Sequence, residues 1–143
     1  MSDTDLVTLY SKRILALAAD IPHLGRLPAP EASVKRRSPL CGSTVTVDLM
    51  VSDGRVSDFA QDVKACALGQ ASAAILGEVV LGRTLPELER ARDELKAMLT
   101  GGPVPVAPFG GYEVLQAAKD YRNRHASILL ALEATCEAMG QRA

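Results

Sequence analysis

Residues 43–63, STVTVDLMVSDGRVSDFAQDV, decide the fold because they predict a β-hairpin. In the first half, Val45, Val47 and Leu49 alternate with polar side chains. Such alternation is typical of a strand that buries one face. The letters SDG at residues 52–54 predict a tight turn, in which Gly54 can take a positive φ angle. RVSDFAQDV then returns as a second, less regular strand, and so short a connection favours antiparallel pairing.

Helical patterns lie on both sides of this hairpin. The spacing of apolar residues predicts a helix over residues 2–20, ended by Pro22, and a second helix over residues 64–82 that is rich in Ala and Gly. TLPE at residues 84–87 is a capping-box pattern that opens a third helix. Shorter and longer helices are expected near 112–119 and 122–139, and a short edge strand near 32–38. We therefore expect an α+β fold with a small antiparallel sheet covered on one side by helices.

Length and charge exclude several classes of function. A chain of 143 residues is expected to form a single domain over residues 1–143. A net charge of −1 and an aromatic content of 3% without Trp argue against nucleic acid or an anionic membrane as the main partner. The acidic N-terminus does not resemble a signal peptide, and no run of about 18 apolar residues is present. We expect a cytoplasmic protein with reduced thiols.

Two of the three cysteines are expected to meet at one end of the sheet. Cys41 lies in SPLCGS just before the first strand, and Cys66 lies in DVKACALG just after the second. The two arms of the hairpin have nearly equal length, so both thiols should reach the same end. The N-terminus of the following helix and nearby Lys64 favour a thiolate at Cys66. Two thiolates in a reducing compartment suggest a soft metal, although both could equally be small buried side chains.

The remaining candidate ligands are weaker. Cys136 lies eleven residues beyond His125 on the expected last helix, about 16 Å along its axis, so the pair cannot share a metal. We interpret Cys136 as a packing residue, and a lone histidine such as His125 is more often structural. Asp62 lies near the end of the returning strand without an evident acid–base partner. A phosphate-binding loop and a nucleophile elbow are absent from the sequence.

These segments together resemble the U-type iron–sulfur cluster scaffold family, which comprises IscU, SufU and the N-terminal domain of NifU. SPLCG is similar to the family pattern NPxCGD, and CALGQASA is similar to CAISxAS. GRTLPE at 82–87 resembles GKTxxE, and YRNR at 121–124 resembles YPxR. The resemblance covers nearly the whole chain in order. It implies a three-stranded antiparallel sheet with helices packed on one face.

The resemblance also implies a metal site with gaps. Cys41 and Cys66 match the first two ligand cysteines, and His125 matches the family histidine. The family aspartate is Ser43 here, and either Ala126 or Ser127 stands where the third cysteine belongs. Asp62, Ser43, water, a small thiol or a second protomer would then have to complete the ligand set. The cargo would be a transient [2Fe–2S] cluster or zinc.

Three functions follow from the resemblance. The first is a non-enzymatic scaffold or carrier that accepts sulfur from a cysteine desulfurase and passes clusters to apo iron–sulfur proteins. The second is a zinc-binding sulfur acceptor for the desulfurase. The third is a metal-free regulatory module that binds the same enzyme. Candidate docking segments are the basic run at residues 35–37, which is otherwise a solvated face, and the apolar loop PVPVAPF at 103–109.

Overall fold

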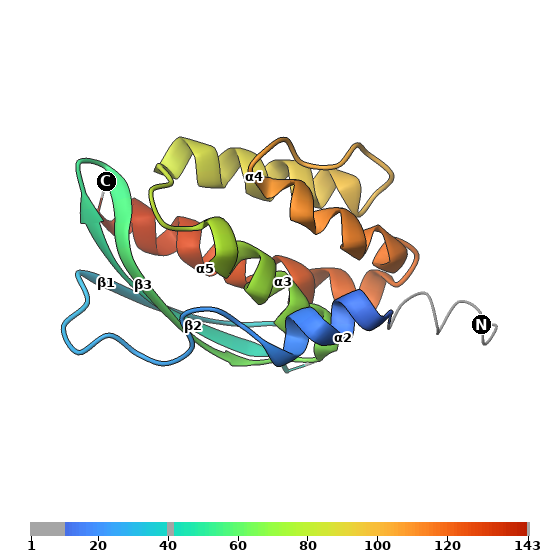
Figure 1. Cartoon of the computed structure of the whole chain (residues 1–143), viewed down its shortest axis with the longest axis horizontal. Helices are drawn as coiled ribbons and strands as arrows, with labels where there is room; N and C mark the ends of the chain where they lie inside the picture. Colours follow the sequence, from blue (N-terminus) through green and yellow to red (C-terminus); the bar gives the residue numbers. More distant parts are fainter. Residues whose placement is uncertain (1–10, 40–41, 143) are drawn as a thin grey trace.

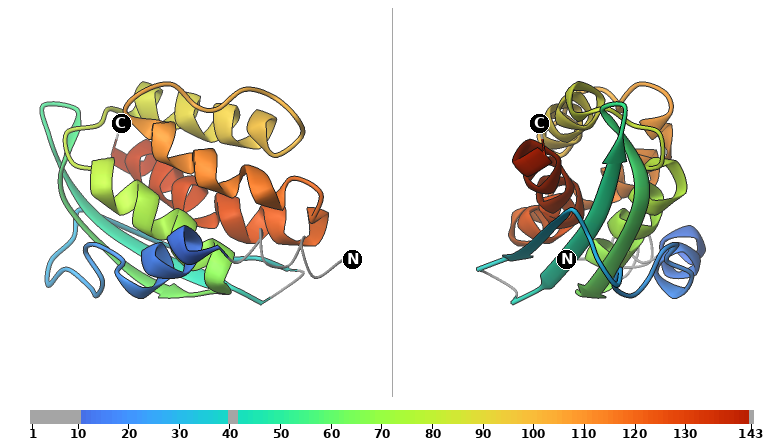
Figure 2. Two further views of the ribbon diagram at one scale, coloured as in Figure 1. Left: turned by 45° about the vertical axis from the view of Figure 1, so that its right-hand side comes forward. Right: turned by 90° about the vertical axis from the view of Figure 1, so that its left-hand side faces the viewer.

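The computed structural model describes residues 11–39 and 42–142. It contains one antiparallel sheet in the order β1-β2-β3. Figure 1 shows the sheet below two helices, α3 and α5, with α4 in a further layer above them. The left-hand view of Figure 2 shows the strands below α3, α4 and α5. The α+β class and the three-stranded sheet expected from the sequence are confirmed.

Along the described chain, one helix precedes the three strands and the remaining helices follow them. The strands are β1 (Ala32–Arg37), β2 (Thr44–Ser52) and β3 (Arg55–Lys64). The α-helices are α2 (Lys12–Ala19), α3 (Ala67–Val79), α4 (Leu85–Met98) and α5 (His125–Arg142). Two 3-10 helices, η1 (Phe109–Ala118) and η2 (Arg122–Arg124), connect α4 to α5. Within the described ranges, no helix is long and apolar enough to cross a lipid bilayer.

The central hairpin forms as its alternation predicts. Val45, Val47 and Leu49 are buried against the helices. The turn places Asp53 and Gly54 at positive φ. A register shift after Met50 interrupts the pairing near the turn. The rest of the ladder is regular, so the other ends of β2 and β3 are held in fixed register down to Lys64.

Two loop segments cover the free edge of β3. Near the start of the strand, Val56 exchanges backbone hydrogen bonds with Gly82 and Arg83 at 2.8 and 3.0 Å. Near its end, Gln61 donates its backbone N–H to His23 and accepts one from Gly25, both at 2.9 Å. An exposed strand edge is a template for unwanted pairing, and these bonds occupy much of it.

An ion pair between exposed Arg26 and buried Asp48 ties the loop before β1 to the outer face of the sheet. Asp48 is fully buried although the alternation places it opposite the valines. Its carboxylate accepts hydrogen bonds from Arg26 Nε at 2.6 Å, the Ser33 hydroxyl at 2.6 Å and the Leu27 backbone N–H at 3.1 Å. Burial alone raises the pKa of Asp48, but these hydrogen bonds outweigh it and hold the pKa below its usual value.

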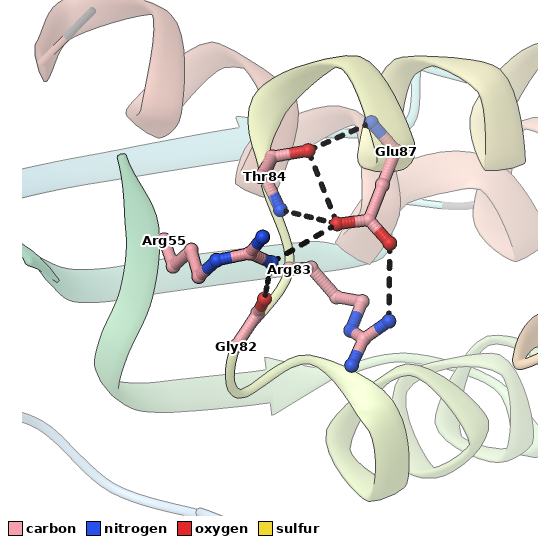
Figure 3. Close-up of polar contacts among 5 residues, drawn as sticks. All are labelled: Arg55, Gly82, Arg83, Thr84 and Glu87. Atoms are coloured by element: carbon pink, nitrogen blue, oxygen red, sulfur yellow. Dashed lines mark hydrogen bonds and ion pairs between the residues drawn. The ribbon is translucent and has the colours of Figure 1, made fainter. Parts of the chain in front are cut away.

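The start of α4 carries the capping box that the sequence predicts. Figure 3 shows Thr84 and Glu87 bonded to each other's backbone N–H groups, with Arg55 and Arg83 beside the carboxylate. Hydrogen bonding from the Thr84 backbone N–H is the main cause that lowers the pKa of Glu87. Arg55 also donates to the Gly82 carbonyl at 2.8 Å, so the helix start is tied to β3.

The core lies between the sheet and the helices, and α5 runs through it. Its buried residues pack against β1, β2, α3 and α4. Ala71, Ala73 and Ala74 of α3 are fully buried, whereas Ala67 at the start of the helix is half-buried. Ser72 on α3 donates to the Ile128 carbonyl of α5, which joins these two helices directly.

Several boundaries differ from the sequence prediction. The strand β3 extends to Lys64, so α3 begins at Ala67 rather than at 64, because pairing with Thr44 holds Lys64 in the sheet. The expected helix at 112–119 is the 3-10 helix η1. In the loop expected to be exposed, Val106 is exposed, but Phe109 is buried in the core. The first helix, expected over residues 2–20, is α2 over Lys12–Ala19, because Ser11 caps its start with the side chain accepting the Ile14 N–H; residues 2–10 lie outside the described residues.

Candidate functional site

Cys66 is the N-cap residue of α3, directly after the end of β3. Its backbone is extended, with φ −67° and ψ 170°, and its carbonyl accepts the Gln70 N–H at 2.9 Å. The side chain is half-buried and makes no capping hydrogen bond. The change from strand to helix therefore leaves the thiol at the end of the sheet, as the sequence predicts.

Two serines lie next to this thiol. The Cys66 Sγ is 3.4 Å from the Ser127 Oγ, and Ser127 donates to the Ser43 Oγ at 3.1 Å. Ser43 precedes β2 and Ser127 lies in the first turn of α5, and both side chains are buried. Three elements thus bring a thiol and two hydroxyls into one chain of contacts.

Gly69 on α3 makes room for this arrangement. A Cβ atom at this position would lie 2.5 Å from the Ser127 Oγ and 2.9 Å from the Ala65 Cβ. Real Cβ atoms do not approach other atoms so closely, so a larger residue would displace the serine. The sequence predicts close packing from the small residues of this helix, Gly69 among them, but it does not indicate that Ser127 is the neighbour.

Cys41 lies outside the described residues. Its neighbour Gly42 has a φ of +70°, and the Gly42 N–H donates to the Ser38 carbonyl at 3.0 Å. Ser38 in turn donates its N–H to the Ser43 carbonyl at 2.8 Å. These bonds hold a corner at Gly42, a position that favours glycine because of its left-handed backbone.

The other predicted site residues are less closely joined to Cys66. His125 begins α5, and its Nε2 lies 3.0 Å from the Ala118 carbonyl, in a hollow that Lys119 and Arg122 also line. Asp62 is half-buried on β3, and Lys64 at the end of this strand is exposed. Among residues 11–39 and 42–142, no three His, Cys, Asp or Glu side chains gather closely enough to hold a metal ion.

Cys136 packs in the core, as predicted. It is 5% exposed on α5, and burial raises the pKa of its thiol to about 11 despite the opposing effect of Arg92. The basic run at residues 35–37 lies on β1, where Arg36 pairs with Glu137 at 2.8 Å. Part of this run is therefore engaged within the molecule.

The fold and the thiol at the sheet end define a class of small α+β proteins with a cysteine-based site. A family model described as the NifU-like N-terminal domain matches residues 9–127. The chain therefore belongs to the NifU-like N-terminal domain family, which confirms the resemblance seen in the sequence.

Individual relatives agree with this assignment. The chain is 26% identical over 131 residues to the iron–sulfur cluster assembly scaffold protein IscU of Thermotoga maritima, covering 92% of each chain. It is 25% identical over 118 residues to IscU of Streptococcus pyogenes, covering 82% of this chain and 74% of the relative. The crystal structure of a nitrogen-fixing NifU-like protein (N-terminal) from Brucella abortus has a TM-score of 0.93, 43% identity and 96% coverage of both chains.

Proposed function

We propose that this chain is an iron–sulfur cluster assembly scaffold or carrier that binds iron or a transient [2Fe–2S] cluster as cargo through Cys41 and Cys66. The role is that of a scaffold and not of an enzyme, in keeping with the family and with relatives named as scaffold proteins. The expected partners are a cysteine desulfurase, which supplies sulfur, and the apo iron–sulfur proteins that receive the cluster. We place these steps in the cytoplasm, where thiols stay reduced.

One observation carries the proposal for the site. Thr44, three residues after Cys41, pairs with Lys64, two residues before Cys66. The register of β2 and β3 holds Thr44 and Lys64 at one end of the sheet, which supports the proposal that the two cysteines share a site there. Thiolate sulfur is the ligand that iron–sulfur clusters prefer, so two cysteines at one sheet end suit this cargo.

The ligand set is incomplete without further donors. A cluster ordinarily takes four protein ligands, and the described residues beside Cys66 offer hydroxyls instead of a third thiol. His125 could join through Nδ1 while its Nε2 stays bonded to the Ala118 carbonyl, the second hydrogen bond that a ligating histidine ordinarily makes. Asp62, a small thiol or a second protomer are the other candidates. A weakly held cluster suits a carrier, which must give its cargo away.

Anaerobic reconstitution with iron and sulfide tests the proposal. We expect a cluster spectrum in visible light and stoichiometric iron, both lost in the double variant Cys41→Ala, Cys66→Ala. Cys136→Ala is the matched control, because this thiol packs in the core, and it should retain the cluster. A spectrum that survives the double variant would contradict the assignment of these ligands. His125→Ala in the same assay then decides whether the histidine contributes.

A second function is favoured by the hydroxyls at Ser43 and Ser127. With few thiols available, Cys66 could act as a sulfur acceptor: its thiolate attacks the outer sulfur of the desulfurase persulfide, and the desulfurase thiolate leaves. Bound zinc would then hold the site in shape. Colourless protein with stoichiometric zinc, and a rise in desulfurase turnover that Cys66→Ala abolishes, would support this function. If the protein binds neither iron nor zinc, and if both cysteine variants still bind the desulfurase, these results would indicate a regulatory module.

A further inference from the structure

Cys66, Ser127 and Ser43 form a chain of hydrogen-bonding groups that spans three elements. Ser127 is 2% exposed and Ser43 is 4% exposed, so both hydroxyls are removed from water. Buried hydroxyls must satisfy their hydrogen bonds within the protein. Ser127 does so with Ser43 on one side and with the Cys66 sulfur on the other.

The direction of these bonds follows from counting hydrogens. A serine hydroxyl has one hydrogen to donate, and Ser127 donates it to Ser43. At 3.4 Å either atom of the Cys66–Ser127 pair could be the donor; with the Ser127 hydrogen given to Ser43, the neutral Cys66 thiol is the donor that completes the contact. When cargo binds the sulfur, the thiol hydrogen is gone. The Ser127 hydroxyl can then rotate and donate to the sulfur without any movement of its oxygen.

We propose that Ser127, supported by Ser43, is the positioning residue of Cys66: it holds the thiol in the empty protein and donates a hydrogen bond to the sulfur in the loaded protein. The hydrogen bond in the loaded protein rests on the proposed function, because it requires cargo bound to the Cys66 sulfur. Each hydroxyl can both donate and accept, so Ser43 can donate to Ser127 once the direction reverses. Hydrogen bonds to ligand sulfurs tune how a bound metal behaves, which gives the two serines a role in holding cargo.

The helix contact around Ser127 supplies a matched control. Ser72 is also buried between α3 and α5, and it donates to the Ile128 carbonyl, one residue after Ser127 along the chain. This hydrogen bond goes to the backbone and not to the Cys66 sulfur. Ser72→Ala therefore loosens the same helix contact while leaving the Cys66–Ser127 bond in place.

The first test is infrared spectroscopy of the metal-free protein. The S–H stretch of Cys66 is assigned as the band that Cys66→Ala removes. Donating a hydrogen bond lowers this frequency, so we expect an upward shift in Ser127→Ala, a smaller one in Ser43→Ala and none in Ser72→Ala. An unshifted band in Ser127→Ala, or an equal shift in Ser72→Ala, would overturn the proposal. Ser43→Ala decides the question should Ser127→Ala fail to fold.

The second test uses cobalt(II) as a spectroscopic probe of the loaded site. Losing a hydrogen bond to sulfur makes it a better donor, so Ser127→Ala should move the sulfur-to-cobalt charge-transfer band to lower energy. The ligand-field bands should stay unchanged, because the number of ligands is the same. Altered ligand-field bands would make Ser127 a direct ligand and overturn the positioning role. Failure to bind cobalt through Cys66 would count against the proposed function, while the infrared result would still decide the role of Ser127.

Discussion

At the scale of single residues, the missing side chain of Gly69 allows α5 to approach the site. In Gly69→Ala, the added Cβ would overlap the Ser127 Oγ. We expect the free energy of unfolding to fall by about 1–2 kcal/mol, because crowding costs about 1–3 kcal/mol and the better helix propensity of alanine returns at most about 1 kcal/mol. Urea unfolding measures the difference.

Gly140 offers the matched control for this substitution. It also lies in a helix, and an added Cβ there would meet nothing within 4 Å. Gly140→Ala should leave stability unchanged or raise it by up to about 1 kcal/mol. Equal stability changes in both variants would show that Ser127 is not crowded at Gly69.

Asp48 makes a second prediction at the residue scale. Asp48→Asn removes the charge that pairs with Arg26 but keeps the shape of the side chain. We expect a loss of about 1–3 kcal/mol at neutral pH, since hydrogen bonds to charged groups are worth more than neutral ones. Asp58→Asn, an exposed carboxylate on β3, should change stability by less than about 0.5 kcal/mol.

The effect of Asp48 should also depend on pH. Folding lowers the pKa of this carboxyl below its unfolded value of about 3.9. Its contribution to stability is therefore complete above that value and is lost as the pH falls through the lower folded value. The gap between the natural protein and Asp48→Asn should narrow below about pH 4 in urea titrations. A gap that stays constant into acid would show that charge is not the cause.

At the scale of elements, the capping box decides how α4 begins. Thr84→Ala removes the hydroxyl that accepts the Glu87 N–H, and we expect a loss of about 1 kcal/mol in the free energy of unfolding. Arg90→Ala, which removes an exposed pair with Glu94, should cost less than about 0.5 kcal/mol. Similar losses in both variants would indicate that the cap contributes nothing beyond a surface contact.

The elements differ in how well the sequence predicts them. Residues 43–63 and the start of α4 follow from local patterns, because alternation and capping act between residues close in the chain. The burial of Asp48 does not follow, since it depends on Arg26 returning from a distant loop. The sequence also predicts the start of α3 too early, at residue 64, for a similar reason. Pairing across the sheet keeps Lys64 in β3.

At the scale of the whole molecule, the site could be predicted only in part. The hairpin register predicts that Cys66 lies at a sheet end, and the structure confirms the position of Cys66. The contact between Ser127 and Cys66 needed the packing of α5 on α3, which leaves no local signal in the sequence. This contact also indicates that Ser127, rather than Ala126, is the neighbour of the Cys66 thiol. The cargo of the site stays a prediction.

Because Cys136 is buried, the rate at which its thiol is labelled measures how often the molecule opens. A protonated thiol that is only 5% exposed, in a hollow lined by charged side chains, resists alkylation, so modification is slow until α5 separates from its neighbours. The labelling rate, divided by that of an unhindered thiol, then gives the population of the open state. We expect mass spectrometry to show half-buried Cys66 labelled well before Cys136, and the Cys136 rate to climb with urea. Equal labelling rates of Cys66 and Cys136 without urea would mean that α5 separates often from its neighbours. A much slower rate for Cys136 would give the free energy of this opening from the labelling of a single residue.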